Sequence, residues 1–288
     1  MKPAVRASRP ALALALAWLL LLLGLALLAP LLPLRDPGEV DLDRMLLAPG
    51  VDGALLGTDL KGRDLLARLL FGARISLLTG ALGSLLALLV GLPWGALAGL
   101  SGGRLDRWMM RAADSLESVP LVVVVLFLLT LAGEYRPELE ALGVGRLGIF
   151  FLALGLLFWL PTARVARAEA LRLRGSGFVQ AARALGAPPS RILCRHVLPN
   201  LLPAAVVLGT LTVPRVILME AFLSFLGLGV EPPAVSWGTL AAEGLAALNP
   251  LVDCWWLLAA PGAALAATLW SLSICGEALQ ARLGTGAP

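Results

Sequence analysis

Apolar residues in this chain fall in long blocks that are separated by short charged segments. Six such blocks stand out, at residues 10–34, 75–103, 118–133, 147–163, 197–226 and 254–276. The hydrocarbon core of a bilayer is about 30 Å thick, so a helix needs about 20 apolar residues to cross it. The pattern therefore predicts an all-α integral membrane protein with six transmembrane helices. The third and fourth blocks are close to the minimum length, and five helices is the alternative count.

The first block follows Lys2, Arg6 and Arg9 and looks at first like a secretory signal peptide. A cleavable signal has an apolar region of about 7 to 15 residues, which is shorter than this block. We therefore expect an uncleaved anchor helix at about 10–34, followed by an extracytoplasmic segment that completes residues 1–72. Residues 73–288 then form a five-helix core, with a cytoplasmic loop at about 164–198.

Composition and charge agree with a membrane protein. Hydrophobic residues make up 59% of the chain and charged residues 15%, whereas soluble domains carry about 25% charged residues. With the N-terminus inside, the inner segments hold fourteen Lys and Arg and the outer segments eight. Positive residues are enriched in cytoplasmic loops, so both termini are predicted to be cytoplasmic. The formal net charge of the chain is +4. The arginines of the cytoplasmic loops explain this excess without nucleic-acid binding, so no nucleic-acid partner is predicted.

Small residues follow one face of the second block. Gly83, Gly91, Gly95 and Gly99 are four or eight residues apart and lie near one side of a helix. Inside a bilayer the hydrophobic effect does not favour contact between helices, because the lipid tails are equally apolar. Membrane helices therefore associate by close approach of their backbones at small residues. We expect this face to pack tightly against another helix rather than to form a ligand groove.

Residue patterns for catalysis or metal binding are missing. The two lysines, Lys2 and Lys61, are in no G-x-x-x-x-G-K-[ST] sequence, which is the loop that cradles nucleotide phosphates. His196 is the single histidine, which excludes any site with several histidine ligands. We predict no catalytic residue, no metal site and no cofactor in this chain.

The longest inner loop has an organisation of its own. It carries seven arginines against one acidic residue. Residues 168–174 and 178–185 are helix-prone, and Gly175, Gly177 and Gly186 break the pattern between and after them. We therefore predict a short, basic, amphipathic helix held between two breakers. A helix that only rests on lipid headgroups is the alternative.

Within this loop, Gln180-Ala181-Ala182 is followed by Gly186 and then by Leu198-Pro199. This arrangement resembles the EAA loop in the permease subunits of ATP-binding cassette (ABC) importers. In that family the loop forms a coupling helix that docks on a separate ATPase subunit. The resemblance implies an ATPase-coupling site that consists of Gln180, Ala181, Ala182, Leu185, Gly186, Leu198 and Pro199. Gln180 departs from the family's Glu, which removes a charge from the contact.

Three further stretches resemble the second-permease (C-type) branch of the dipeptide/oligopeptide/nickel group. They are LLGTDLKGRDLLARLLFGARISL from Leu55, EAFLSFLGLGVEPPAVSWG from Glu220 and NPLVDCWWLLAAPG from Asn249. The C-terminal end departs from the group, since Gly276-Glu277 replaces the usual Gly-Asp.

The resemblance implies the ABC type I importer permease fold and a location in the bacterial cytoplasmic (inner) membrane. It also implies a homologous permease as heterodimer partner, two ATPase subunits that hold ATP and Mg, and an extracytoplasmic substrate-binding protein. The implied function is import of peptides, with nickel as the alternative cargo. This chain is then not itself an enzyme.

Charged residues inside the fifth block are candidates for a transport role. A charge at the centre of a membrane helix costs roughly 2.5 to 3.5 kcal/mol on insertion scales, so Arg215 and Glu220 are expected to face the bundle interior, water or an interface. Five residues along a helix is about 140° around the axis, which disfavours a direct pair. We predict that Glu220, Ser224 and Arg215 line the pathway or an outer gate, and the alternative for Glu220 is a side chain that snorkels to the outer surface. The resemblance places this gate at about residues 224–238.

Two further questions stay open at the level of sequence. Asp59, Arg63 and Asp64 of the outer segment either contact a binding protein or form local ion pairs and a helix cap.

The main alternative to an ABC importer is an ion-driven secondary transporter, which would also need ionisable residues inside the membrane. A non-transporting scaffold is the third hypothesis.

Overall fold

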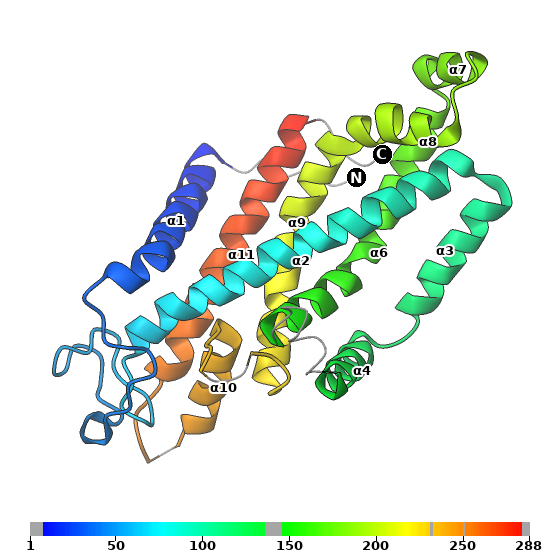
Figure 1. Ribbon diagram of the computed structural model, residues 1–288. Coiled ribbons are helices and arrows are strands. Elements are labelled where there is room, and N and C mark those ends of the chain that lie inside the picture. The colour runs from blue at the N-terminus through cyan, green and yellow to red at the C-terminus, as the bar shows by residue number, and fades with distance from the viewer. Residues whose placement is uncertain (1–7, 136–145, 231–232, 250, 284–288) are drawn as a thin grey trace. The chain divides into compact units, whose positions relative to one another are not determined.

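The computed structural model describes residues 8–135, 146–230, 233–249 and 251–283. Two predicted features extend outside these ranges. They are the basic residues Lys2 and Arg6 before the anchor helix, and Glu231 and Pro232 within the predicted outer gate. Long helices dominate the described residues (Figure 1). In chain order the α-helices are α1 (Arg9–Leu28), α2 (Leu65–Ser101), α3 (Gly103–Glu117), α4 (Leu121–Glu134), α6 (Arg146–Arg174), α7 (Gly177–Ala184), α8 (Pro189–Ile192), α9 (Leu198–Phe225), α10 (Trp237–Ala247) and α11 (Trp256–Leu283). Three short turns accompany them: η1 (Ala29–Leu31), η2 (Leu42–Arg44) and the π-helical η3 (Leu193–Val197).

Five helices of the described residues are long and apolar enough to cross a membrane. They are Arg9–Leu31, Leu65–Ser101, Phe150–Arg174, Pro189–Phe225 and Trp256–Leu283. The predicted third span coincides with α4, which has 14 residues and is shorter than the roughly 20 residues that a crossing needs. The predicted all-helical membrane architecture is therefore confirmed, whereas the count of six spans is not.

Helix bounds differ from the apolar blocks where a helix continues beyond its apolar residues. α2 begins at Leu65, well before the block at 75–103, because the Asp64 carboxylate accepts the Ala67 N–H at 2.8 Å and caps the helix. α6 continues through basic residues to Arg174. Hydropathy marks only the apolar part of a helix, whereas the backbone hydrogen bonds continue until a cap or breaker ends them.

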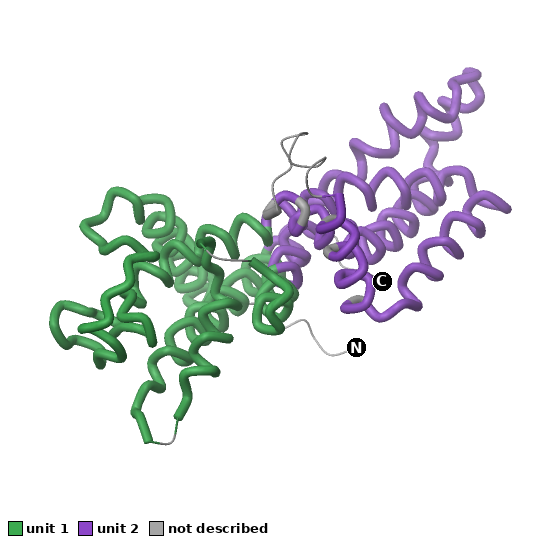
Figure 2. The backbone as a smooth tube through the Cα atoms, turned by 60° about the horizontal axis from the view of Figure 1, so that its bottom comes forward, with its two compact units in different colours: residues 1–80, 217–278 green, residues 81–216, 279–288 purple. Residues whose placement is uncertain are grey.

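The chain forms two compact units, which Figure 2 draws in separate colours. Unit 1 comprises residues 1–80 and 217–278. Its core joins α1, the first part of α2, α10 and α11 around the buried Trp237 and Trp256. The Trp18 indole donates to the Thr268 hydroxyl at 3.1 Å, which ties α1 to α11. The division into residues 1–72 and 73–288 stays a prediction.

Unit 2 comprises residues 81–216 and 279–288. Within it, the predicted glycine face of α2 lies against α6. A Cβ atom added to Gly95 would lie 2.0 Å from the Ala163 carbonyl oxygen, and one on Gly91 or Gly99 would lie 2.6 or 2.5 Å from other α6 carbonyl oxygens. Gly83 instead meets a side chain of α9. Only glycine allows the two backbones to lie this close, as in other membrane helix pairs.

Candidate functional site

The predicted coupling helix is α7, which the structure places at Gly177–Ala184, one residue before the predicted bounds at each end. It ends in a Schellman motif, in which the Ala187 N–H donates to the Ala182 carbonyl at 3.0 Å and the Gly186 N–H donates to the Arg183 carbonyl at 2.9 Å. Gly186 has a φ of +77°, a left-handed conformation that glycine adopts at low cost. Gly186 therefore ends the helix.

One face of α7 is anchored and the other is open. Val179 and Ala182 are buried in a core that they share with α2, α6, α8, η3 and α9. Leu185, at the C-terminal end, is 87% exposed. On α7 and directly after it, the exposed residues of the predicted site are Gln180, Ala181, Leu185 and Gly186, and we name this set the coupling surface. It consists largely of small and apolar residues on a helix that shares a core with the long helices α2, α6 and α9.

Gln180 occupies the position where the resemblance expects Glu. Its side-chain amide donates to the Gly175 carbonyl at 3.1 Å. A carboxylate has no donor for this bond. The departure from the family pattern thus has a local role, since Gln180 helps to close the turn between α6 and α7.

Leu198 and Pro199 begin α9 directly after the π-helical turn η3. Pro199 has no N–H, so the Arg195 carbonyl loses its usual helical partner, and the Leu198 N–H bonds to the Leu193 carbonyl in π-helical spacing. Leu198 is half-buried and Pro199 is exposed. The structure therefore places these two residues at the junction between the loop and α9, apart from the coupling surface.

Glu220 of α9 is fully buried, with 0% exposure. Its carboxylate accepts from the Ser76 hydroxyl of α2 at 2.9 Å and from the Ser224 hydroxyl at 2.8 Å. The Val230 N–H donates to the Ser224 oxygen, and the Trp237 N–H donates to the Ser76 oxygen, both at 3.3 Å. Glu220 thus joins α2, α9 and the segment that leads into α10. A pathway role for Glu220 and Ser224 stays a prediction.

Arg215 lies on the same helix and is exposed. Its exposure fits the offset of about 140° from Glu220 around the helix axis. Its predicted place in a pathway or gate stays a prediction.

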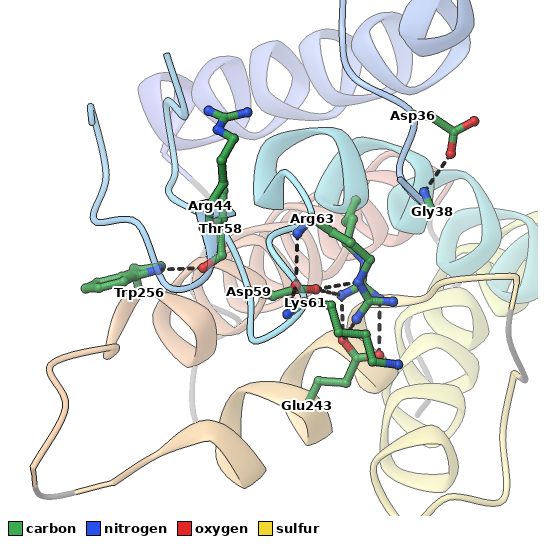
Figure 3. Close-up of polar contacts among 10 residues, drawn as sticks. Asp36, Gly38, Arg44, Thr58, Asp59, Lys61, Arg63, Glu243 and Trp256 are labelled. Atoms are coloured by element: carbon green, nitrogen blue, oxygen red, sulfur yellow. Dashed lines mark hydrogen bonds and ion pairs between the residues drawn. The ribbon is translucent and has the colours of Figure 1, made fainter. Parts of the chain in front are cut away.

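The segment before α2 holds a cluster of ion pairs (Figure 3). Asp59 accepts Arg63 Nε at 2.7 Å and Arg68 Nη1 at 2.6 Å through the same oxygen. Its other oxygen accepts the Lys61 N–H at 2.8 Å. Glu243 of α10 pairs with both arginines, at 3.0 Å for Arg63 and 2.5 Å for Arg68. Local ion pairs are therefore present, and contact with a binding protein stays a prediction.

Sequence reasoning missed two members of this cluster, Arg68 and Glu243. Arg68 is 1% exposed. The sequence offered one sign of its role, because Arg68 is a charged residue in the otherwise apolar stretch after Asp64. Glu243 is 175 residues away from Arg68, and no local pattern connects the two.

A second missed pair links Asp106 of α3 to Arg167 of α6. Arg167 Nε and Nη2 donate to the two carboxylate oxygens at 2.5 and 2.7 Å. The hydrogen bond from Arg167 lowers the pKa of Asp106 below its ordinary value, against the opposing effect of burial. The sequence could have indicated this pair, because Asp106 lies on the same helix face as the apolar residues Met109 and Ala113, and all three are buried.

Comparison with known proteins identifies the class. Residues 91–286 match the family model described as binding-protein-dependent transport system inner membrane component. The chain belongs to this family. Together with the five long apolar helices, this membership makes it a multi-pass protein of the bacterial inner membrane.

Individual relatives agree with this membership. The chain is 38% identical over 243 residues to the oligopeptide transport system permease protein OppC of Haemophilus influenzae, with 84% of this chain and 74% of that protein covered. It is 37% identical over 270 residues to the dipeptide transport system permease protein DppC of Bacillus subtilis, with 93% and 80% covered. The resemblance to this group of permeases is confirmed.

A solved structure shows the same fold. A chain of the MetNI methionine ABC transporter, in an inward-facing conformation, aligns with a TM-score of 0.58 and 17% identity, and the match covers 75% of this chain and 96% of that chain. The expected ABC importer permease fold is therefore confirmed.

Proposed function

We propose that this chain is one permease subunit of an ATP-driven peptide importer, and that the coupling surface of α7 docks on an ATPase subunit. The relatives named for dipeptide and oligopeptide transport support the cargo. The exposure of Leu185 at the end of an anchored helix carries the docking proposal. An exposed apolar side chain at the end of a fixed helix can insert into a hydrophobic groove on a partner protein.

Force from an ATPase would reach the membrane helices through the anchor of α7. Val179 and Ala182 share one core with residues of α6 and α9, so a displacement of α7 moves these helices with it. The ATPases hold ATP and Mg, and no cofactor is assigned to this chain. Their nucleotide states must bind the two conformations of the helix bundle with different affinity, because equal affinity shifts no equilibrium.

The remaining parts of the assembly follow the same proposal. A homologous permease forms the other half of the channel, two ATPases occupy the cytoplasmic side, and a substrate-binding protein delivers peptides from outside. Both termini and α7 are cytoplasmic, and the predicted third span at 118–133 is proposed as the sixth crossing, although α4 is short for a bilayer core of about 30 Å. Glu220, Ser224 and Arg215 are proposed for the pathway or its gate.

The test uses capture of the ATPases and uptake in cells. The chain is expressed with the permease and ATPases of its own gene neighbourhood, as wild type and as Leu185→Glu. The matched control is Leu251→Glu, because Leu251 is 91% exposed and lies outside α7. We expect Leu185→Glu to weaken ATPase capture about tenfold or more, because an unpaired carboxylate would be buried in the apolar contact, and to abolish uptake of labelled peptides while the protein still inserts.

Two outcomes would contradict the proposal in different ways. Equal capture by both variants would remove α7 as the docking element. No capture by the wild type, together with uptake driven by an ion gradient, would favour a secondary transporter. Uptake of nickel in place of peptides would leave the docking proposal intact and change the cargo.

A further inference from the structure

A recess of about 410 Å³ opens between α3 and the C-terminal half of α6. Its lining is strongly basic, with four arginines against one aspartate. The lining residues are Arg107, Met110, Arg111, Asp114, Arg164 and Arg167. Neither the coupling surface nor the buried Glu220 belongs to it.

Acidic neighbours hold two of the four guanidinium groups in place. Arg167 is fixed by its bidentate pair with Asp106. Arg164 pairs with Asp114 at 2.8 Å and with Glu117. These pairs give the recess a wall whose geometry is set before any ligand binds.

The other two arginines have their donors available. Arg107 and Arg111 are one helical turn apart on α3, so their side chains leave the same face. Both are exposed, and within the described ranges neither forms an ion pair. Arginine binds phosphate oxygens with two parallel N–H donors, and a pair of such groups on a rigid helix suits a phosphate anion.

The position of the recess points to a ligand from the lipid surface. A neighbouring face of α3 carries Leu105, Trp108 and Leu116, which are 50%, 71% and 57% exposed. Exposed apolar residues beside basic ones are typical of a helix that lies at a membrane surface, and Trp is enriched at the headgroup level. The apolar helix α4 begins at Leu121, shortly after α3 ends.

We propose that this recess binds a phosphate group, and that the phosphate belongs to the headgroup of an anionic phospholipid. Arg107 and Arg111 bind the phosphate oxygens, while Arg164 and Arg167, whose charges are already paired with carboxylates, set the shape of the wall. Basic pockets beside membrane helices on the cytoplasmic side commonly bind anionic headgroups. The proposal does not depend on which cargo the protein carries or on the docking of α7.

The test compares lipid retention by the full-length chain. Wild type and variants are reconstituted in phosphatidylcholine bilayers with or without phosphatidylglycerol, extracted in mild detergent, and analysed for bound lipid by native mass spectrometry. The test variant is Arg107→Gln with Arg111→Gln. The matched control, Arg104→Gln with Arg282→Gln, removes the same charge at exposed residues outside the recess. Tryptophan fluorescence during heating checks that each variant is folded.

We expect the wild type and the control to retain phosphatidylglycerol in preference to phosphatidylcholine, and the test variant to retain about tenfold less of it. Addition of inorganic phosphate separates the two sources of the anion. If phosphatidylglycerol stays bound at millimolar phosphate, the ligand is the lipid headgroup. If phosphate displaces it, the phosphate site is supported and a soluble phosphate compound becomes its ligand. Equal retention by the test and control variants would overturn the proposal.

Discussion

Arg68 of α2 and Glu243 of α10 form a bidentate ion pair, with Nη1 at 2.5 Å from Oε2 and Nη2 at 3.1 Å from Oε1. Arg68 also pairs with the buried Asp59. One guanidinium thus joins the outer segment, the start of α2 and the short helix α10. Arg68 is almost fully removed from water, so its charge depends on these two carboxylates for compensation.

Removing Arg68 should therefore destabilise the protein strongly. Arg68→Ala removes one of the two arginines that pair with the buried Asp59 and leaves Arg63 as the other. The loss should therefore approach but not exceed the cost of breaking a buried pair, which is about 3 to 5 kcal/mol. The matched control is Arg35→Ala, whose pair with Asp41 is partly exposed and whose loss should have little effect because solvent screens it. Thermal unfolding of the purified chain, followed by tryptophan fluorescence, measures both. Similar unfolding temperatures for the two variants would show that the Arg68 pairs contribute little.

Gly95 should tolerate no side chain. A Cβ atom there would lie 2.0 Å from the Ala163 carbonyl oxygen, so Gly95→Ala must push α2 and α6 apart, at a cost of about 1 to 3 kcal/mol. Gly262 of α11 has open space around it, and Gly262→Ala should be neutral or slightly stabilising. Unfolding temperatures of the two variants provide the comparison, and a stable Gly95→Ala protein would argue against the close α2–α6 contact.

Asp106 should make stability depend on pH in the acid range. Its folded-state pKa lies below its ordinary value, because Arg167 donates to the carboxylate, whereas the pKa in the unfolded chain is about 3.9. The stabilisation is therefore complete above the unfolded pKa and is lost as the pH falls through the folded pKa. The difference in unfolding temperature between wild type and Asp106→Asn should shrink below about pH 4. A difference that stays constant from neutral to acid pH would contradict the role of this pair.

The Glu220 carboxylate should stabilise the folded protein through its hydrogen bonds to Ser76 and Ser224. Glu220→Ala leaves the Ser76 and Ser224 hydroxyls without their acceptor, and each unsatisfied buried group costs about 1 to 3 kcal/mol. Glu220→Gln keeps one acceptor oxygen and should lose less stability in the same unfolding experiment. Peptide uptake by the Gln variant then tests the pathway prediction. Wild-type uptake by a stable Gln variant would exclude a need for the charge itself.

Much of the membrane architecture could be predicted from the sequence because its signals are local. Blocks of apolar residues located the helices that cross the membrane, and Gly177 and Gly186 bounded α7 to within one residue. The glycine face of α2 was also visible, since four-residue spacing alone places Gly91, Gly95 and Gly99 on one side of a helix. The sequence did not decide whether α4 crosses the membrane, because its apolar block is close to the minimum length for a crossing.

The partners of the charged residues were decided only by the tertiary structure. Sequence showed that Glu220 must avoid lipid, but not that Ser76 and Ser224 enclose it. It gave no sign that Arg68 meets Glu243 or that Asp106 meets Arg167. Local patterns fix helices because each hydrogen bond joins residues four apart, whereas an ion pair depends on where two distant helices come to lie. The sequence thus determined which segments are helices in the membrane, and the packing of those helices decided which charges meet.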